Sequence, residues 1–282
     1  MLSRLFAARR VPGASWEELC ESGGTTVERA AVGGARADRA GYAFAIGYTA
    51  ALEALAGETR AAFCATEDGG NHPRAIATQL VDGRVTGSKR WATLADRATH
   101  LLVVARDGTD DAGRPRLRVV RVARDAPGVT LEVSAAAFVP EIAHARVTLD
   151  GAAGEVLPGD GYADYVKPFR TVEDIHVHAA LVGYWLGAAR QRGFARGLVE
   201  RLAMIAAALV ALGAEDARAP ATHVALGGVL AATADLLAEL EAAWLHVPDE
   251  EWARWQRDRA ILRVAGTPRA ERLARAWQAL AG

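Results

Sequence analysis

Residues 63–107 read FCATEDGGNHPRAIATQLVDGRVTGSKRWATLADRATHLLVVARD, and this stretch decides the fold class of the chain. An apolar run at residues 61–65 leads into an acidic loop with glycines, and alternating apolar and polar residues follow. Asp-Gly and Gly-Ser pairs separate the short runs, and another apolar run occupies residues 101–105. Short alternating segments punctuated by such pairs are typical of β-strands joined by tight turns. We therefore expect an antiparallel sheet here, flanked on both sides by helical sequence.

Three predicted segments follow from the distribution of strand-like and helix-like sequence. Residues 59–159 form the β segment, because further strand-like runs follow the opening stretch as far as residue 149. Residues 1–58 form a short helical segment, and residues 160–282 carry apolar residues at the spacing of an antiparallel helical bundle. Strands that cluster between helical segments indicate an α+β fold, not an alternating parallel sheet.

Local signals mark the ends of several predicted helices. Ser15 followed by Glu18 fits a capping box, in which two side chains satisfy free N–H groups at a helix start. Pro268 lies in the first turn of the last helix, where a missing N–H is harmless. The predicted helices of the last segment cover residues 171–196, 197–214, 221–244, 250–264 and 269–281.

Composition argues against several classes of protein. The 282 residues carry a net charge of −1, which does not suit an electrostatic nucleic-acid or membrane-surface role. Two cysteines leave no disulfide framework and no cysteine metal site. No uninterrupted apolar run reaches the roughly 18 residues of a membrane helix, and the first residues, MLSRLFAARR, do not form a signal peptide. We expect a cytoplasmic protein without nucleic-acid or membrane partners.

Two short motifs resemble the middle domain of the acyl-CoA dehydrogenases. The family carries an aromatic-x-x-Thr-Glu-Pro loop with glycines, matched by FCATEDGG at residues 63–70, where Asp68 replaces the proline. Further along it carries Asn-Gly-x-Lys-x-Trp-Ile-Thr, matched by TGSKRWAT at residues 86–93. The order and the gap between the motifs also agree. The resemblance implies an acyl-CoA dehydrogenase-like architecture with a shortened N-terminal helical segment, an antiparallel β-barrel-like middle domain and a C-terminal helical bundle.

The resemblance implies that flavin adenine dinucleotide (FAD) binds against the β segment. In this family the flavin supplies the redox chemistry, while the protein supplies orientation and a base. By resemblance, Thr66 and Thr93 offer hydrogen bonds to the flavin ring, and Trp91 packs on it. The residues that would let the backbone approach the pyrophosphate are Gly69, Gly70 and Asn71. Without the resemblance, the same motifs describe a tight hairpin loop with Trp91 as an ordinary core aromatic.

The catalytic base of most family members is missing at its usual place. They carry a glutamate in a Glu-Gly-Thr segment between the last helices, where this chain has Ala265, and a methyl group cannot accept a proton. A minority branch, including the isovaleryl-type enzymes, places the glutamate on the first helix of the C-terminal bundle, followed by a glycine. Glu173 with Gly183 fits that pattern, although Asp174 stands where the branch has arginine. Glu173 is therefore the candidate base; the alternative is a carboxylate that stabilises the helix N-terminus.

Two histidines follow Glu173 on the same predicted helix. Glu173 and His176 share one helix face, and Asp174 and His178 share another. A Glu-x-x-His pair can be half of a di-iron site, but such a site needs a second pair, which the sequence lacks. We therefore expect no metal site. The histidines are interpreted as lining a cavity or an interface.

The resemblance implies an FAD-dependent oxidoreductase that acts on acyl-CoA, another acyl thioester or a related carbonyl substrate, as a homo- or hetero-oligomer. Two alternatives remain open. The family's Arg-x-x-Phe-Gly and Phe-Gly-Gly segments, which bind the dinucleotide across a subunit interface, are not matched, although Arg201 lies near the first. These losses would weaken binding of the adenine and pyrophosphate. Ala265, Asp174 and the shortened N-terminal segment suit the first alternative, a non-catalytic or degenerate partner subunit of a hetero-oligomeric acyl-CoA dehydrogenase. The other alternative is a flavin monooxygenase on the same fold, because fold does not determine chemistry.

Overall fold

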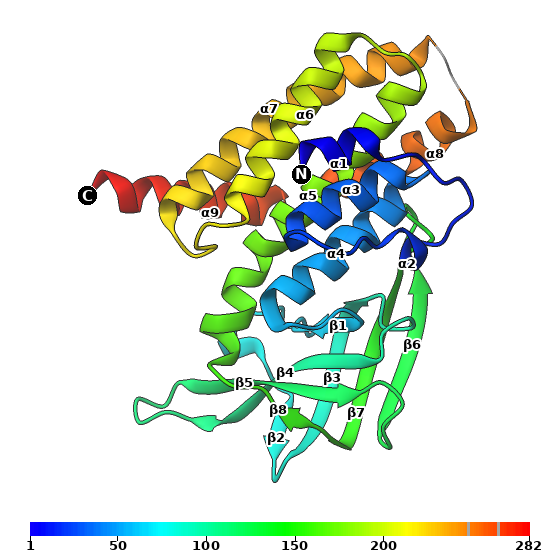
Figure 1. The fold of residues 1–282 in the computed structure, drawn as a ribbon. Coiled ribbons are helices and arrows are strands. Elements are labelled where there is room, and N and C mark those ends of the chain that lie inside the picture. The colour runs from blue at the N-terminus through cyan, green and yellow to red at the C-terminus, as the bar shows by residue number, and fades with distance from the viewer. Residues whose placement is uncertain (247–248, 264–265) are drawn as a thin grey trace. The chain divides into compact units, whose positions relative to one another are not determined.

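The chain folds into two compact units, one made of strands and one made of helices. The sheet unit is Leu55–Arg170, and the helical unit combines Met1–Ala54 with Thr171–Gly282. In the computed structural model, helices come first, strands follow and helices return, which confirms the predicted order (Figure 1). The residues that the structure describes are 1–246, 249–263 and 266–282.

One sheet organises the sheet unit. Among the described residues, seven of its strands lie in the order β6-β7-β3-β2-β4-β5-β8. The eighth strand, β1, is not part of this order and pairs with β4. Most pairs are antiparallel as expected, but β1 and β2 each pair with β4 in parallel, so the sheet is mixed. The strands are β1 (Ala61–Cys64), β2 (Gln79–Val81), β3 (Arg84–Thr93), β4 (His100–Thr109), β5 (Pro115–Ala123), β6 (Val129–Ala135), β7 (Ala143–Ala153) and β8 (Glu155–Val156).

The apolar run in β4 is explained by burial on both faces of the sheet. All five residues from Leu101 to Ala105 are fully buried. A strand covered on both faces shows a continuous apolar run, whereas a strand with one solvated face alternates. β7 alternates in this way, since Ala145, Val147 and Leu149 are buried and their neighbours are not. This alternation gives the β3–β7 ladder a buried inner face and an open outer face.

The helices begin largely where the sequence indicates. Ser15 and Glu18 form the predicted capping box at the start of α2, and Thr25 and Glu28 form another at the start of α3. Pro268 lies in the first turn of α9, as predicted. The α-helices are α1 (Leu2–Ala7), α2 (Trp16–Leu19), α3 (Thr26–Arg36), α4 (Ala40–Ala56), α5 (Lys167–Gln191), α6 (Arg196–Leu212), α7 (Pro220–Leu245), α8 (Glu250–Asp258) and α9 (Gly266–Ala281).

Glycines let α3 and α4 approach the backbone of α5 within the helical unit. A Cβ atom added to Gly183 would lie 2.0 Å from the carbonyl oxygen of Ala31, and one added to Gly34 would lie 2.0 Å from that of Ala180. A Cβ atom on Gly47 would meet the Cα atom of Val177 at 2.6 Å. Such distances leave no space for a side chain, so these glycines set the spacing of the helices.

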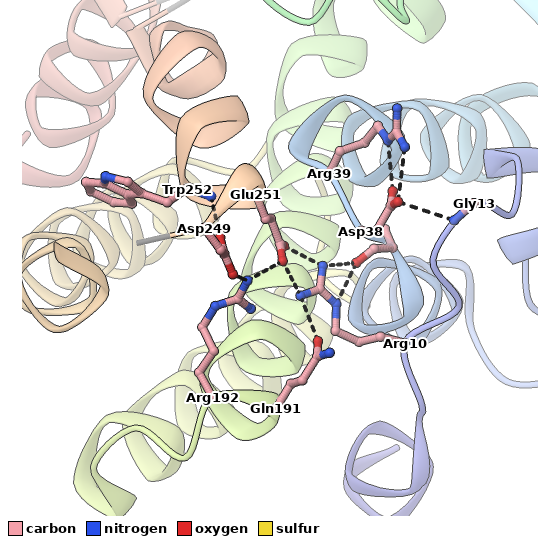
Figure 2. A network of polar contacts seen from close by, with 10 residues as sticks. Arg10, Gly13, Asp38, Arg39, Gln191, Arg192, Asp249, Glu251 and Trp252 are labelled. Carbon is pink, nitrogen blue, oxygen red and sulfur yellow. Dashed lines mark hydrogen bonds and ion pairs between the residues drawn. The ribbon is translucent and has the colours of Figure 1, made fainter. Parts of the chain in front are cut away.

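A polar network ties the N-terminal segment to α8 (Figure 2). Arg10 donates to both carboxylate oxygens of Glu251, at 2.5 and 2.8 Å, and to the carbonyl oxygen of Ala37 at 2.6 Å. Arg192 at the end of α5 donates to the same Glu251 at 2.7 Å and also contacts Asp249. Arg10 and Glu251 are both nearly buried, so a bidentate pair joins the two ends of the chain away from solvent.

The helix α7 leaves most of its surface uncovered within this chain. By length and composition it is long and apolar enough to cross a membrane, yet only 22% of its most apolar window is buried. Counting uninterrupted apolar residues overlooked this helix. It packs against α6 and α9, and Arg201 of α6 forms an ion pair with its Glu239 at 2.5 Å. The exposed large apolar side chains on these three helices include Met204, Leu245, Trp277 and Leu280.

Candidate functional site

A buried ion pair joins the two motifs that were recognised in the sequence. Lys89 Nζ lies 2.6 Å from Glu67 Oε1, and the two side chains are 0% and 8% exposed. The Glu67 carboxylate also accepts hydrogen bonds from the N–H groups of Ala77 at 2.7 Å and Thr78 at 3.1 Å. Both oxygens of this carboxylate are therefore bonded within the protein, and the Thr66 loop is fixed to β3.

The protonation of this pair follows from its burial and its partners. Burial acts to raise the pKa of Glu67, but Lys89 and the hydrogen bonds outweigh burial and lower it. Burial also lowers the pKa of Lys89, and the Glu67 carboxylate opposes that shift. A second link lies beside the pair, because the Arg90 N–H donates to the carbonyl oxygen of Thr66 at 2.8 Å. The loop and the strand are thus held in a fixed register.

Trp91 is turned out of the sheet by a β-bulge. The pairing of β3 with β7 shifts register between Lys89 and Ala92, and Trp91 has a φ of 58°, in the left-handed region. Lys89 and Ala92, the paired residues of β3 on either side of the bulge, are fully buried, whereas the Trp91 side chain is 62% exposed. Bulges commonly redirect a side chain in this manner. This exposure rules out the alternative in which Trp91 is an ordinary core aromatic.

Three side chains surround Trp91 on the outer face of the β3–β7 ladder. The Arg90 guanidinium carbon lies 5.4 Å from the centroid of the indole ring. The His144 ring lies 6.3 Å from the indole ring, centroid to centroid, with an interplanar angle of 77°. Thr93 is paired with His144 across the ladder, and its hydroxyl lies 3.5 Å from the Trp91 carbonyl oxygen. The sequence motifs did not identify His144, although the alternation of residues 143–149 places it on this face.

The glycine loop folds into a tight turn. Glu67 and Gly70 exchange two backbone hydrogen bonds of 2.9 Å, and Gly70 has a φ of 99°. The N–H of Gly70 is therefore used inside the turn, while Gly69 is exposed. Asn71 is half-buried, and its side-chain oxygen accepts a hydrogen bond from Arg170 at 3.1 Å. Of these loop residues, Gly69 presents the most open backbone.

The structure places Glu173 on α5 in the helical unit, whereas the other predicted site residues lie in the sheet unit. Glu173 is half-buried. The adjacent Asp174 is buried and accepts hydrogen bonds from Arg269 at 2.8 Å and Arg272 at 2.5 Å, both on α9. Burial acts to raise the pKa of Asp174, but the two guanidinium groups outweigh it and lower the pKa. Asp174 is therefore charged and compensated. Ala265 lies outside the described residues.

The histidines of α5 are buried and neutral. The His176 ring contacts the Val172 carbonyl oxygen through Nδ1 at 2.7 Å and the Thr26 hydroxyl through Nε2 at 2.8 Å. His178 Nδ1 donates to the Asp174 carbonyl oxygen at 2.7 Å. Burial lowers the pKa of each histidine to about 4. Among the described residues there is no group of three or more potential metal ligands.

The sheet unit offers side chains that fit a flavin ring. An open indole face can stack on a planar heteroaromatic ring, and aromatic pairs of this kind are worth about 0.5–1.5 kcal/mol beyond the buried area. The half-buried Thr66 and Thr93 lie on the two segments that the ion pair joins, and each has a hydroxyl that can donate or accept. An aromatic ring and two hydroxyl groups therefore lie on backbone segments that the Glu67–Lys89 ion pair holds together.

Solved structures share this fold. Butyryl-CoA dehydrogenase from Megasphaera elsdenii matches with a TM-score of 0.67 at 14% identity, covering 99% of this chain and 93% of that chain. FkbI, for biosynthesis of a methoxymalonyl extender unit, matches at 0.61 and 21%, covering 96% and 86%. PigA with FAD and proline matches at 0.64 and 13%, covering 98% and 87%. No protein-family model and no curated protein matches the sequence. The chain has the acyl-CoA dehydrogenase fold, as its two motifs predicted.

Proposed function

We propose that this protein is an FAD-dependent oxidoreductase that acts on an acyl thioester, such as an acyl-CoA, or on a related carbonyl substrate. The observation that carries the proposal is the exposed Trp91, which a bulge turns outward beside a loop fixed by the Glu67–Lys89 pair. A strained left-handed residue with a large exposed indole is costly for folding alone, and such features cluster at functional sites. One solved structure of the same fold is PigA with FAD and proline, and another is a glutaryl-CoA dehydrogenase in complex with glutaryl-CoA, which supports the proposed ligands.

In this proposal the chain binds and orients the cofactor through the sheet unit. Trp91 would pack on the ring, Thr66 and Thr93 would provide hydroxyl groups, and Gly69, Gly70 and Asn71 would let the backbone approach the pyrophosphate. Bound flavin supplies the capacity to accept a hydride. The protein contributes a defined position for the ring.

Glu173 is the proposed base, which removes a proton next to the substrate carbonyl. It is a half-buried carboxylate on α5, and a carboxylate held within reach of the proton can serve as a general base. Asp174 does not leave an uncompensated negative charge beside Glu173, because Arg269 and Arg272 bind it.

The first test is retention of flavin by the purified protein. We expect a visible flavin band that stays with the protein through gel filtration after addition of excess FAD. Trp91→Ala should lose most of this band. Trp277→Ala is the matched control, because Trp277 is similarly exposed, at 57% against 62%, but lies on α9. A wild-type protein that retains no flavin at saturating FAD would contradict the proposal.

A second proposal concerns assembly. The uncovered apolar surface of α7, with Met204 of α6 and Trp277 of α9, favours a homo- or hetero-oligomer formed through the helical unit. One structural neighbour is the ChsE4–ChsE5 complex, which consists of two different chains. Sedimentation velocity of the wild type and of Leu245→Glu tests this, since the charged variant should be less associated. A monomeric wild type would contradict it.

The cytoplasmic location stays a prediction from composition.

A further inference from the structure

His144 lies next to the candidate flavin site, yet neither recognised motif contains it. It is on β7, directly opposite Thr93 of β3, and on its other side it pairs with Ser134 of β6. Both neighbouring strands therefore hold its backbone. Its side chain is half-buried and makes a T-shaped contact with the Trp91 ring. The half-buried His144 ring, on a backbone held by two strands, therefore lies beside the exposed Trp91 indole.

Trp91 has few other contacts that set the orientation of its ring. With 62% of the side chain exposed, the indole is not held by core packing. Exposed side chains change rotamer on the picosecond-to-nanosecond timescale unless a neighbour restrains them. The Arg90 guanidinium lies over the indole, but the same group is also bound to Asp68 at 2.7 Å. The contact with His144 is an aromatic restraint on the orientation of the ring, beside the cation–π contact with Arg90.

His144 acts as an aromatic ring and not as an additional cation. Burial lowers its pKa, so that the imidazole is neutral near pH 7. A neutral ring is compatible with the two guanidinium groups on this face, Arg90 and Arg146. Arg146 is itself engaged by the Ser88 hydroxyl at 3.2 Å, and Glu132 is its partner across the β6–β7 ladder.

We propose that His144 is a positioning residue for the flavin site, which holds the Trp91 indole in the orientation that packs on a planar heteroaromatic ring. The inference rests on the proposed function. It adds a residue from β7 to a site otherwise built from β3 and the loop at Thr66. His144 acts through Trp91, so its effect on flavin affinity should depend on the presence of that indole.

A double-mutant cycle tests this dependence by measuring the Kd for FAD. We expect His144→Ala and His144→Gln to weaken binding about three- to tenfold, the scale of one aromatic edge contact. His144→Phe, which keeps an aromatic ring, should stay within about twofold. In a Trp91→Ala background, His144→Ala should have no further effect, because the interaction is already absent. The matched control is Thr148→Ala, an exposed position on the same face of β7.

A second measurement does not need flavin. In protein labelled with 5-fluorotryptophan, the ¹⁹F resonance of Trp91 is the one lost in Trp91→Phe. We expect His144→Ala to shift and sharpen this resonance as the indole becomes mobile, while His144→Phe and Thr148→Ala leave its width unchanged. An unchanged Trp91 resonance in His144→Ala would overturn the positioning role. So would an equal loss of affinity in the presence and absence of Trp91. Absence of flavin binding in the wild type would instead refute the proposed function.

Discussion

Lys89 and Glu67 form a buried ion pair that connects strand β3 to the loop at Thr66, across 22 residues of sequence. Glu67 belongs to the motif at residues 63–70 and Lys89 to the motif at residues 86–93, and neither motif alone predicts the contact between them. Together they hold Thr66 beside the strand that carries Trp91 and Thr93. The pair therefore acts on the candidate site by fixing the backbone on which the site is built.

Removal of the Lys89 ammonium should be strongly destabilising. Lys89→Met leaves a buried carboxylate without its counter-ion, which costs about 3–5 kcal/mol. Urea denaturation at pH 7 measures this loss. The control is Arg114→Gln, which breaks the ion pair with Asp110, where the arginine is 75% exposed; exposed pairs contribute about 0–1 kcal/mol. Equal effects of the two substitutions would contradict the structural role of the buried pair.

The Glu67–Lys89 pair also predicts how the stability of the protein depends on pH. The folded-state pKa of Glu67 is lowered, so its contribution to stability is complete above the unfolded value near 4.5 and is lost as pH falls through the folded value. In Lys89→Met, burial acts without the counter-ion and raises the pKa of Glu67. The difference in unfolding free energy between wild type and variant should therefore shrink between pH 7 and pH 4. A constant difference over this range would contradict the assignment.

The buried histidines add a second pH dependence. Both have a folded-state pKa of about 4 against an ordinary value of 6.5. Their neutral forms favour the folded state, so this stability is full above pH 6.5 and is lost as pH falls toward 4. His178→Gln should flatten the loss of stability between pH 6.5 and 4, as measured by urea denaturation. A wild-type slope in His178→Gln would show that His178 does not titrate in this way.

Gly183 supported the assignment of Glu173, but the structure also gives it a packing role. Gly183→Ala would place a methyl group 2.0 Å from the Ala31 carbonyl oxygen, which forces α3 and α5 apart. We expect a loss of about 1–3 kcal/mol or more in thermal or urea denaturation. Gly228→Ala on α7 is the matched control, since nothing lies within 4 Å of its added Cβ. This control should gain up to about 1 kcal/mol from helix propensity. Similar effects at both glycines would refute the close packing.

Catalysis by Glu173 makes a separate prediction. Glu173→Gln should lower turnover at least about 10²-fold, because a carboxamide cannot accept the proton, while FAD stays bound. The assay is reduction of the bound flavin by an acyl-CoA series, followed by its absorbance. Glu271→Gln, which removes an exposed carboxylate from α9, should retain wild-type turnover. Unchanged turnover in Glu173→Gln would exclude it as the base.

Sequence patterns predicted the strands and helices well, because each depends on local alternation or spacing. They failed at Trp91 for a physical reason. With period two, Trp91 belongs on the same face as the buried Lys89, and only the bulge between Lys89 and Ala92 moves it outward. The compensation of Asp174 was equally inaccessible, since Arg269 lies 95 residues further along the chain. Contacts of this kind depend on tertiary packing, which the spacing of residues along the sequence does not reveal.

The contact between Arg10 and Glu251 has a consequence for how the protein is made. The sheet unit is one continuous stretch, so all of it is synthesised before α6 to α9. The first helices must wait for α5 to cover them and for α8 to supply Glu251. We expect nascent chains to expose α3 and α4 throughout this interval. Truncation at either terminus should damage the same helical unit, because neither end of the chain completes it alone.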